Sequence, residues 1–233
     1  MSSPTPSAAP AAKPLRPAAT LVVMRDSPRG LETLLLRRGE RNDQSSGAWV
    51  FPGGLLDAQD REAHRCCGGL APHEADAALG MAEGALDYFV AAVRECFEEA
   101  GLLLARAADG AIVPLHEEQS RHMGPWRGRL HRGEATITEF CEAFGLTLAL
   151  DEIAYHTRWV TPAIRHKRWD TRFFFAIAPQ GQESAHDEIE LVEQLWLTPA
   201  EALARGDDLK LLNPTKTTLS MMARFASAAE VMA

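Results

Sequence analysis

Three glutamates lie close together in the segment Arg94-Glu95-Cys96-Phe97-Glu98-Glu99-Ala100-Gly101-Leu102. In an α-helix, which turns by about 100° per residue, Glu95, Glu98 and Glu99 share one face. Carboxylates held this close repel one another unless a positive charge lies among them. Mg²⁺ or Mn²⁺ fits this role, because hard divalent cations take carboxylate oxygens and keep waters and substrate phosphates as further ligands. Arg94 precedes Glu98 by one helical turn and can orient its carboxylate.

The same spacing also has a purely structural interpretation. A helix at the protein surface commonly carries an acidic face opposite its apolar face, so the helix alone leaves both interpretations open. The segment Phe51-Pro-Gly-Gly54 favours the chemical one. Two glycines after a strand let the backbone approach a ligand or metal closely, and they expose carbonyl and N–H groups to phosphate. On their own, the same glycines would indicate a plain turn.

Together the two segments resemble the signature of the Nudix hydrolases, which reads Gly, five residues, Glu, seven residues, then Arg-Glu-apolar-any-Glu-Glu-any-Gly-apolar. The second half is matched at every fixed position by Arg94, Glu95, Cys96, Glu98, Glu99, Gly101 and Leu102. The first half differs. Counting from Gly54 places Asp60 where the signature has Glu, and 33 residues instead of seven separate Asp60 from Arg94. An insertion therefore splits the signature, and a role for Asp57 or Asp60 stays open.

The split signature resembles the coenzyme A diphosphatase branch of the Nudix family, particularly its members with an interrupted box. Segments that resemble landmarks of this branch are Leu36–Arg41, Val50–Asp57, Trp159–Pro162, Asp170–Phe174 and Trp196–Leu203. The resemblance covers about residues 18–225. It implies an α/β fold, namely a Nudix-type α/β/α sandwich with a mixed sheet in a single domain.

The resemblance also implies an activity, the hydrolysis of a nucleoside diphosphate linked to another moiety, with Mg²⁺ or Mn²⁺ bound. Coenzyme A or an acyl-CoA would be cleaved to 3′,5′-ADP and 4′-phosphopantetheine or its acyl derivative. Carried over by position, Glu95 and Glu99 would be the main metal ligands, and Glu98 a third ligand or the residue that activates water. The Gly54 carbonyl would bind a metal, and Arg94 would hold the glutamates in place. The predicted catalytic residues are thus Glu98, Arg94 and Glu95.

Further candidates follow from the same resemblance. An additional activating carboxylate often lies on a distant loop in this family, and Asp187, Glu188 and Glu190 are candidates here. The predicted substrate-binding residues are Arg37, Arg38, Arg41, Phe51, Gly53 and Gly54. A second basic cluster, residues 165–168, could meet a further phosphate. For the acidic loop and for both basic clusters, ordinary solvated surface is the alternative.

Two other functions are compatible with these residues. Within the enzyme class, the substrate could be ADP-ribose, NADH or a nucleotide sugar, in which case the basic clusters would be incidental. In another class, the chain could be a catalytically idle nucleotide sensor, although an idle domain has no need of three repelling carboxylates. A structural zinc site at His64, Cys66, Cys67 and His73 is disfavoured, because no second Cys-x-x-Cys pair accompanies it.

The periodicity of apolar residues predicts the elements that must carry these groups. Leu86, Val90, Val93, Phe97 and Ala100 form one stripe of a helix over residues 86–100, ended by Gly101. Other predicted elements are a hairpin of 19–24 and 31–36, strands at 49–50, 159–160, 172–177 and 190–197, and helices at 137–144, 199–204 and from 213 onward.

The composition is that of an ordinary globular protein, with 233 residues of which 46% are hydrophobic and 24% charged. The net charge of −8 argues against bulk binding to nucleic acid or to an anionic membrane. No apolar run approaches the ~18 residues that cross a bilayer, and four cysteines without paired spacing favour a reducing compartment. We therefore expect a cytoplasmic protein that binds a small nucleotide substrate, with neither nucleic acid nor membrane as partner. A homodimer is compatible with the sequence.

The predicted organisation has two parts. Residues 1–17 form a Pro/Ala-rich leader that we expect to be disordered, with a transit peptide as the alternative. Residues 18–226 form the Nudix domain, interrupted at about residues 61–84 by an irregular insertion with room for one short helix.

Overall fold

The computed structural model of the chain describes residues 14–40, 46–165, 167–187 and 190–233. Its strands are β1 (Arg16–Ser27), β2 (Gly30–Arg38), β3 (Trp49–Val50), β4 (Gly53–Leu55), β5 (Cys67–Gly68), β6 (Ala105–Arg106), β7 (Thr147–Ala149), β8 (Ile153–Val160), β9 (Trp169–Ile177) and β10 (Leu191–Leu197). Its α-helices are α1 (Pro72–Leu79), α2 (Leu86–Ala100), α3 (Glu117–His131), α4 (Ile137–Phe144), α5 (Pro199–Ala204), α6 (Asn213–Met222) and α7 (Ala228–Met232). Two 3₁₀ segments are η1 (Ala58–Cys66) and η2 (Leu150–Glu152).

The main sheet contains seven strands within these residues, in the order β10-β2-β1-β9-β8, with β3 added to β2 and β4 added to β1. β1 and β9 run parallel, whereas β1 and β2 form the predicted antiparallel hairpin. β4 pairs with the first half of β1, placing Gly53 opposite Thr20 and Gly54 opposite Ala19. The sheet is therefore mixed, and the two glycines lie within it.

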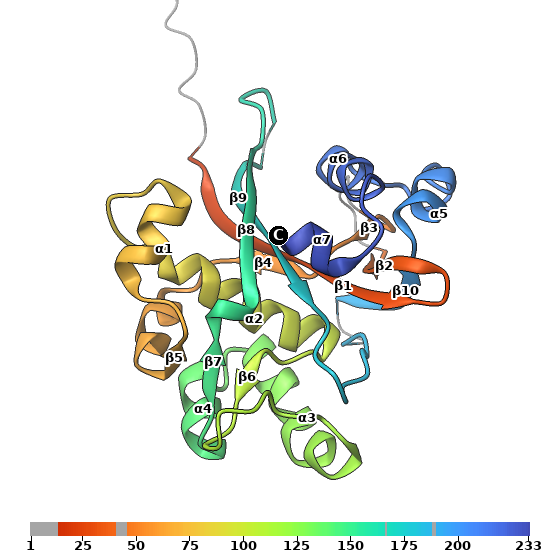
Figure 1. Cartoon of the computed structure of the whole chain (residues 1–233). Helices are drawn as coiled ribbons and strands as arrows, with labels where there is room; N and C mark the ends of the chain where they lie inside the picture. Colours follow the sequence, from red (N-terminus) through yellow and green to blue (C-terminus); the bar gives the residue numbers. More distant parts are fainter. Residues whose placement is uncertain (1–13, 41–45, 166, 188–189) are drawn as a thin grey trace, which may run out of the picture.

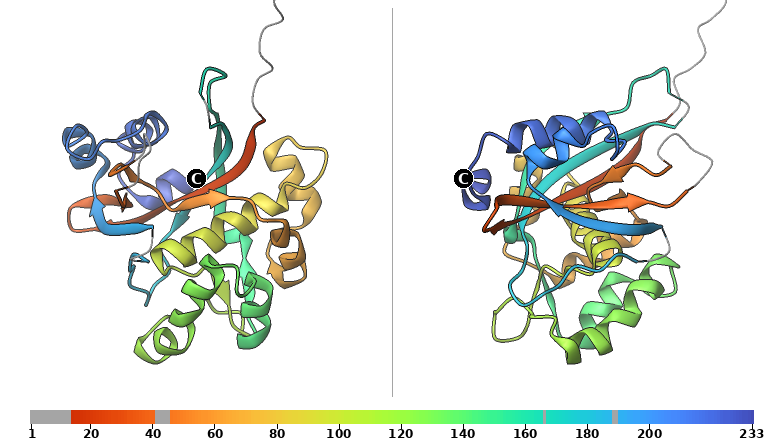
Figure 2. Two further views of the ribbon diagram at one scale, coloured as in Figure 1. Left: turned by 180° about the vertical axis from the view of Figure 1, so that it is seen from behind. Right: turned by 90° about the vertical axis from the view of Figure 1, so that its right-hand side faces the viewer.

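Helices cover both faces of this sheet, as the edge-on view of Figure 2 shows. Neighbouring residues of a strand face opposite sides. On β1, Leu21 packs into the core shared with α2, and Val22 packs into the core shared with α6 and α7. The molecule is thus the predicted α/β/α sandwich, with the glutamate-bearing α2 on one face of the sheet.

The locally patterned elements agree with the sequence prediction. α2 spans Leu86–Ala100 as predicted, and Gly101 ends it with a φ of 70°, the left-handed conformation that glycine adopts easily. The remaining predicted strands and helices are also present, and α7 follows the helix that begins at Asn213. The largest difference is at β8, which begins at Ile153, whereas the prediction gave only its last two residues, 159–160. Periodic apolar residues locate these elements because their pattern depends only on neighbouring sequence.

The insertion differs from the prediction, because it is regular rather than irregular. η1, β5 and α1 occupy most of it, beside α2 (Figure 1). Three residues of these elements, Ala63, Ala75 and Leu79, are buried in the core that contains α2. A second difference is α3, because no helix is predicted between Gly101 and Ile137. Gly124, Pro125 and Gly128 lower its helix propensity. Its apolar contacts with the core therefore hold it in place, in a way that local propensity does not predict.

The predicted limits of the domain stay a prediction. β1 already includes two residues of the predicted leader, Arg16 and Pro17, which pair with Trp169 and Asp170 of β9. At the other end, Ala228 of α7 is buried. In the described part of the chain, no helix is long and apolar enough to cross a membrane, and the cytoplasmic location stays a prediction.

Candidate active site

Arg94 organises the acidic face of α2. Its Nε and Nη2 atoms donate to the Asp60 carboxylate at 2.7 and 3.1 Å, its Nη1 donates to Glu95 at 2.9 Å and to Glu98 at 3.0 Å, and its Nη2 also reaches the Leu55 carbonyl at 3.0 Å. One guanidinium thus joins α2, β4 and η1. The expected contact between Arg94 and Glu98 is present.

The predicted position of the first signature carboxylate is occupied by Asp60. This residue is fully buried in η1, and its Oδ2 atom also accepts a hydrogen bond from the Asp57 N–H at 2.7 Å. Asp57 itself is exposed and caps the start of η1 by accepting from the Gln59 N–H. The structure therefore gives different places to the two aspartates that the sequence left open, since Asp60 contacts Arg94 beside the glutamates and Asp57 caps the start of η1.

The two glycines of β4 lie directly against the glutamates. The Gly53 N–H donates to Glu99 Oε2 at 2.8 Å. A Cβ atom on Gly54 would stand 2.5 Å from the Glu95 carboxyl carbon, and one on Gly53 would stand 2.7 Å from the Thr20 Cα. Only glycine permits this close approach of the strand to its neighbours.

The glutamates are not a solvated surface face. Glu98 is 5% exposed and Glu99 is 6% exposed. Burial disfavours the charged carboxylate and raises the pKa of Glu95 to about 7; it also raises the pKa values of Glu98 and Glu99, and neighbouring Glu95 raises that of Glu99 further. The structural interpretation of the acidic face is thus wrong for this helix.

The donor set fits a divalent cation. Three carboxylates (Asp60, Glu95 and Glu98) contact one guanidinium, and the buried Glu99 carboxylate lies within electrostatic range of Glu95. Carboxylates outnumber the guanidinium in a nearly dry site, which is costly unless a cation balances their charge. Among the described residues, no three acidic, imidazole or thiol groups are already gathered as a closed ligand set. Glu95 and Glu99, beside Gly53 and Gly54, are the groups that would hold such a cation.

The loop before β10 brings further charged groups to this site. Asp187 accepts hydrogen bonds from the Glu190 and Leu191 N–H groups at 3.1 and 2.9 Å. Its charge raises the pKa of Glu99, and Arg38 lowers it, so both residues lie within electrostatic range of Glu99. Glu190 stands 3.9 Å from Arg38. The third candidate of this loop, Glu188, lies outside the described residues.

The predicted basic residues separate onto the two faces of β2. Arg38 lies on the face of Leu36, toward α2, whereas Arg37 points to the other face and pairs with Glu193 of β10. Arg41 lies outside the described residues. The connection that holds Arg165, Lys167 and Arg168 lies near the start of β1, where the Arg16 N–H donates to the Arg168 carbonyl at 3.0 Å.

Phe51 has a different environment from the one predicted. It is 3% exposed and packs in the core on the α6 face, together with Trp49. The apolar ring precedes the glycines in sequence but is turned away from the glutamates. Phe51 is therefore a core residue, and we do not propose that it binds substrate.

A family model described as the NUDT19 Nudix domain matches residues 72–214. The chain belongs to this Nudix family. The match includes all of α2, while the glycines of β4 and Asp60 precede it.

Individual relatives extend the similarity over most of the chain. Acyl-coenzyme A diphosphatase NUDT19 of Gallus gallus is 28% identical and that of Homo sapiens is 27% identical, over 86% and 87% of this chain. The chain spans 63% of the length of each of these relatives. A crystal structure of a NUDIX hydrolase from Alicyclobacillus acidocaldarius superposes with a TM-score of 0.77 at 27% identity, covering 95% of this chain and 97% of that one.

Proposed function

We propose that this Nudix domain is a metal-dependent diphosphatase that hydrolyses coenzyme A or an acyl-CoA. The observation that carries the proposal is the cluster of three glutamates on α2, in which Arg94 joins Glu95 and Glu98 and the Gly53 N–H donates to the buried Glu99. The names of the relatives from Gallus gallus and Homo sapiens support the choice of substrate. The products would be 3′,5′-ADP and 4′-phosphopantetheine or its acyl derivative.

In this proposal the buried carboxylates have separate roles. Glu95 and Glu99 would hold Mg²⁺ or Mn²⁺ with the Gly54 carbonyl, and Glu98 would be a third ligand or would accept a proton from the attacking water. The bound cation would neutralise charge on the diphosphate and lower the pKa of water. The water oxygen forms a bond to phosphorus as the P–O bond of the diphosphate bridge breaks, leaving one phosphate on each product. Asp187 is the candidate for a further proton acceptor.

Arg94 and Arg38 have different roles: Arg94 positions two of the glutamates, and Arg38 supplies positive charge near them. Arg94 fixes the rotamers of Glu95 and Glu98 through hydrogen bonds of 2.9 and 3.0 Å. Arg38, on the same face of the sheet as α2, faces the glutamates with a positive charge that a diphosphate would meet. Arg37 contributes less in this proposal because it is paired with Glu193 on the other face.

Product analysis by mass spectrometry tests the proposed function. The purified protein is incubated with coenzyme A, an acyl-CoA, ADP-ribose, NADH and a nucleotide sugar, each with Mg²⁺, with Mn²⁺ and with a chelator. Selective release of 3′,5′-ADP that the chelator abolishes is the expected result. Turnover of ADP-ribose or NADH alone would keep the glutamate chemistry and reject the coenzyme A assignment.

Two further results would reject the catalytic proposal. One is a folded Glu98→Gln variant that hydrolyses coenzyme A at a rate within a few-fold of the unmodified protein. The other is binding of nucleotides without turnover of any, which would favour the sensor.

A further inference from the structure

A second arginine, Arg127 of α3, contacts the end of the glutamate helix. Its Nε donates to the carbonyls of Phe97 and Glu98 at 2.9 and 3.1 Å. Its Nη2 donates to the carbonyl of Glu99 at 3.1 Å and to the carbonyl of Ala185 at 2.6 Å. One side chain therefore joins the last turn of α2 to the loop that precedes β10.

These contacts complete the hydrogen bonding of a helix terminus. The last four carbonyls of an α-helix lack partners within the helix. Here Arg127 serves three of them, and the Ala185 N–H donates to the fourth, the Ala100 carbonyl, at 2.8 Å. A cation at this end of a helix also interacts favourably with the helix dipole. The fixed fork of a guanidinium suits several acceptors at once, which a lysine ammonium does not.

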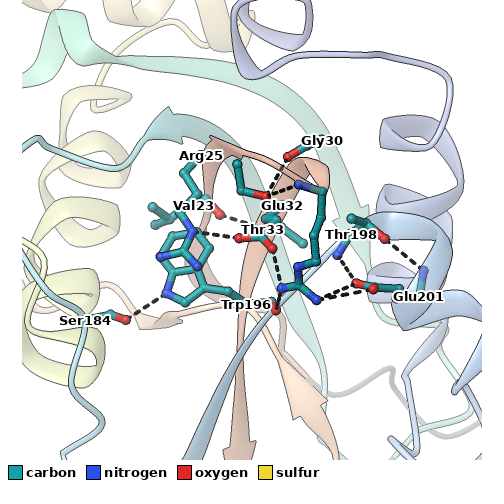
Figure 3. Close-up of polar contacts among 11 residues, drawn as sticks. Val23, Arg25, Gly30, Glu32, Thr33, Ser184, Trp196, Thr198 and Glu201 are labelled. Carbon is teal, nitrogen blue, oxygen red and sulfur yellow. Dashed lines mark hydrogen bonds and ion pairs between the residues drawn. The ribbon is translucent and has the colours of Figure 1, made fainter.

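The same loop is held at other points. The Gln182 side chain donates to the carbonyls of Leu103 and Val113, at 2.9 and 2.7 Å, and accepts from the Leu103 N–H at 2.8 Å. The indole N–H of Trp196 donates to Ser184 Oγ at 3.0 Å, and Figure 3 shows this contact beneath the Arg25 guanidinium. Among the side chains of this arrangement, Arg127 contacts both α2 and the loop, beside the direct backbone hydrogen bond from Ala185 to Ala100.

Asp187 lies in this loop two residues after Ala185. Its charge affects the pKa values of both Arg127 and Glu99. It opposes the lowering of the Arg127 pKa by burial, and it raises the pKa of Glu99. Asp187 thus lies within electrostatic range of Arg127 on one side and of the α2 glutamates on the other. The position of Asp187 relative to Glu99 depends on the segment that Arg127 binds.

We propose that Arg127 is a positioning residue that holds the Glu98–Glu99 turn of α2 and the Gln182–Asp187 segment in one fixed arrangement. The effect on turnover rests on the proposed function, whereas the effect on structure does not. No contact of Arg127 with substrate is required. Displacements of about 1 Å in such an arrangement can cost roughly 100-fold in rate.

The experiment compares Arg127→Met and Arg127→Lys with Arg121→Met, a control on the same helix whose side chain is exposed. Three quantities are measured: hydrogen exchange of the amides of Gln182–Asp187, Mn²⁺ affinity by electron paramagnetic resonance, and kcat and KM for coenzyme A. For Arg127→Met we expect hydrogen exchange at Gln182–Asp187 to become faster and kcat to fall, each by about 10-fold or more. Mn²⁺ should bind more weakly, and KM should stay within about 3-fold of that of the unmodified protein. Arg127→Lys should lie between this variant and the unmodified protein, and Arg121→Met should match the unmodified protein.

The proposal is overturned if folded Arg127→Met keeps kcat within about 2-fold of the unmodified protein. It is also overturned if kcat falls without faster exchange at Gln182–Asp187, because Arg127 would then act by another route. If Arg127→Met fails to fold, the same three quantities are compared between Arg127→Lys and the unmodified protein. If the unmodified protein hydrolyses none of the tested diphosphates, the proposed function fails, and exchange together with Mn²⁺ affinity still decides the role of Arg127.

Discussion

Asp60 and Arg94 form a two-point ion pair, with Nε–Oδ1 at 2.7 Å and Nη2–Oδ2 at 3.1 Å. Asp60 lies in the first turn of η1 and Arg94 lies in α2, with β5 and α1 between them in sequence, yet they meet at the face of α2 that carries the glutamates. The chain therefore leaves and returns to the glutamate face of α2 beside the same guanidinium, although 33 residues separate Asp60 from Arg94. Asp60 supplies a carboxylate at the place where the signature has Glu.

Breaking this pair should lower both stability and activity. In Asp60→Asn the Arg94 guanidinium loses a buried charged partner, although it keeps Glu95 and Glu98. We expect the free energy of unfolding in urea to fall by about 3 kcal/mol, at the lower end for a buried pair that loses one member, and kcat to fall with it. The control is Asp57→Asn, because the exposed Asp57 caps η1 and asparagine caps equally well. Equal urea midpoints for both variants would contradict the prediction.

A single methyl group at Gly54 should displace Glu95. The Gly54→Ala Cβ would overlap the Glu95 carboxylate, which must turn away from its place beside β4. We expect kcat for coenzyme A to fall by about 100-fold, since a small misplacement of a reacting group has this effect, and Mn²⁺ affinity to fall as well. Gly124→Ala is the matched control, because a Cβ on this α3 glycine meets nothing within 4 Å. Unchanged Mn²⁺ affinity in Gly54→Ala would separate Gly54 from the metal site.

The metal-free protein should lose stability as pH rises from about 4.3 to about 7, the interval between the pKa of a free glutamate and that of Glu95. Burial raises the pKa of Glu95, and Arg94, Glu98 and Asp60 face the same carboxylate. Over this interval the folded protein holds a proton that the unfolded chain has released, so deprotonation favours unfolding.

Glu95→Gln isolates this contribution. In chelator, its melting temperature should be close to that of the unmodified protein near pH 5 and higher near pH 8. The difference should shrink at pH 8 when Mg²⁺ is added, because the cation stabilises the ionised form of Glu95. A difference that stays constant with pH in chelator would show that the Glu95 proton does not contribute.

Arg38 and Arg37 should differ in their effect on substrate binding. Arg38→Gln removes a positive charge from the α2 face, and we expect KM for coenzyme A to rise by about 10-fold, the order of one charge-assisted hydrogen bond. Arg37→Gln removes an ion pair with the exposed Glu193, which contributes little in water, so KM should stay within about 2-fold. Steady-state kinetics measure both, and equal effects would contradict the assignment by face.

Much of the framework follows from local sequence. The β1–β2 hairpin and α2 could be predicted because their apolar residues repeat with the period of a strand or a helix, and Gly101 supplies the left-handed end of α2. Neighbouring residues decide such features, so no knowledge of distant contacts is needed. The same holds for the glutamate face, whose spacing is a property of the helix itself.

Other features depend on contacts between distant segments. α3 contains two glycines and a proline, so its propensity argues against the helix that its packing on the core imposes. The side chains of Arg37 and Arg38 could be separated only by the face of β2 on which each lies, and Phe51, between β3 and β4, only by the core into which it packs. Phe51 belongs to the core, although its place beside the glycines suggested a ligand contact.

The sequence by itself determined the chemistry of this protein, that is, three carboxylates on one helix with an arginine one turn before the second and two glycines before the insertion. The tertiary structure alone decided which groups surround that chemistry, because Asp60, Arg38 and Arg127 reach α2 from separate elements. The physical reason is that the spacing of residues within one helix fixes the direction in which each side chain points. It does not fix which residues of other elements pack against that side chain. The burial that raises the glutamate pKa values comes from the packed elements around them.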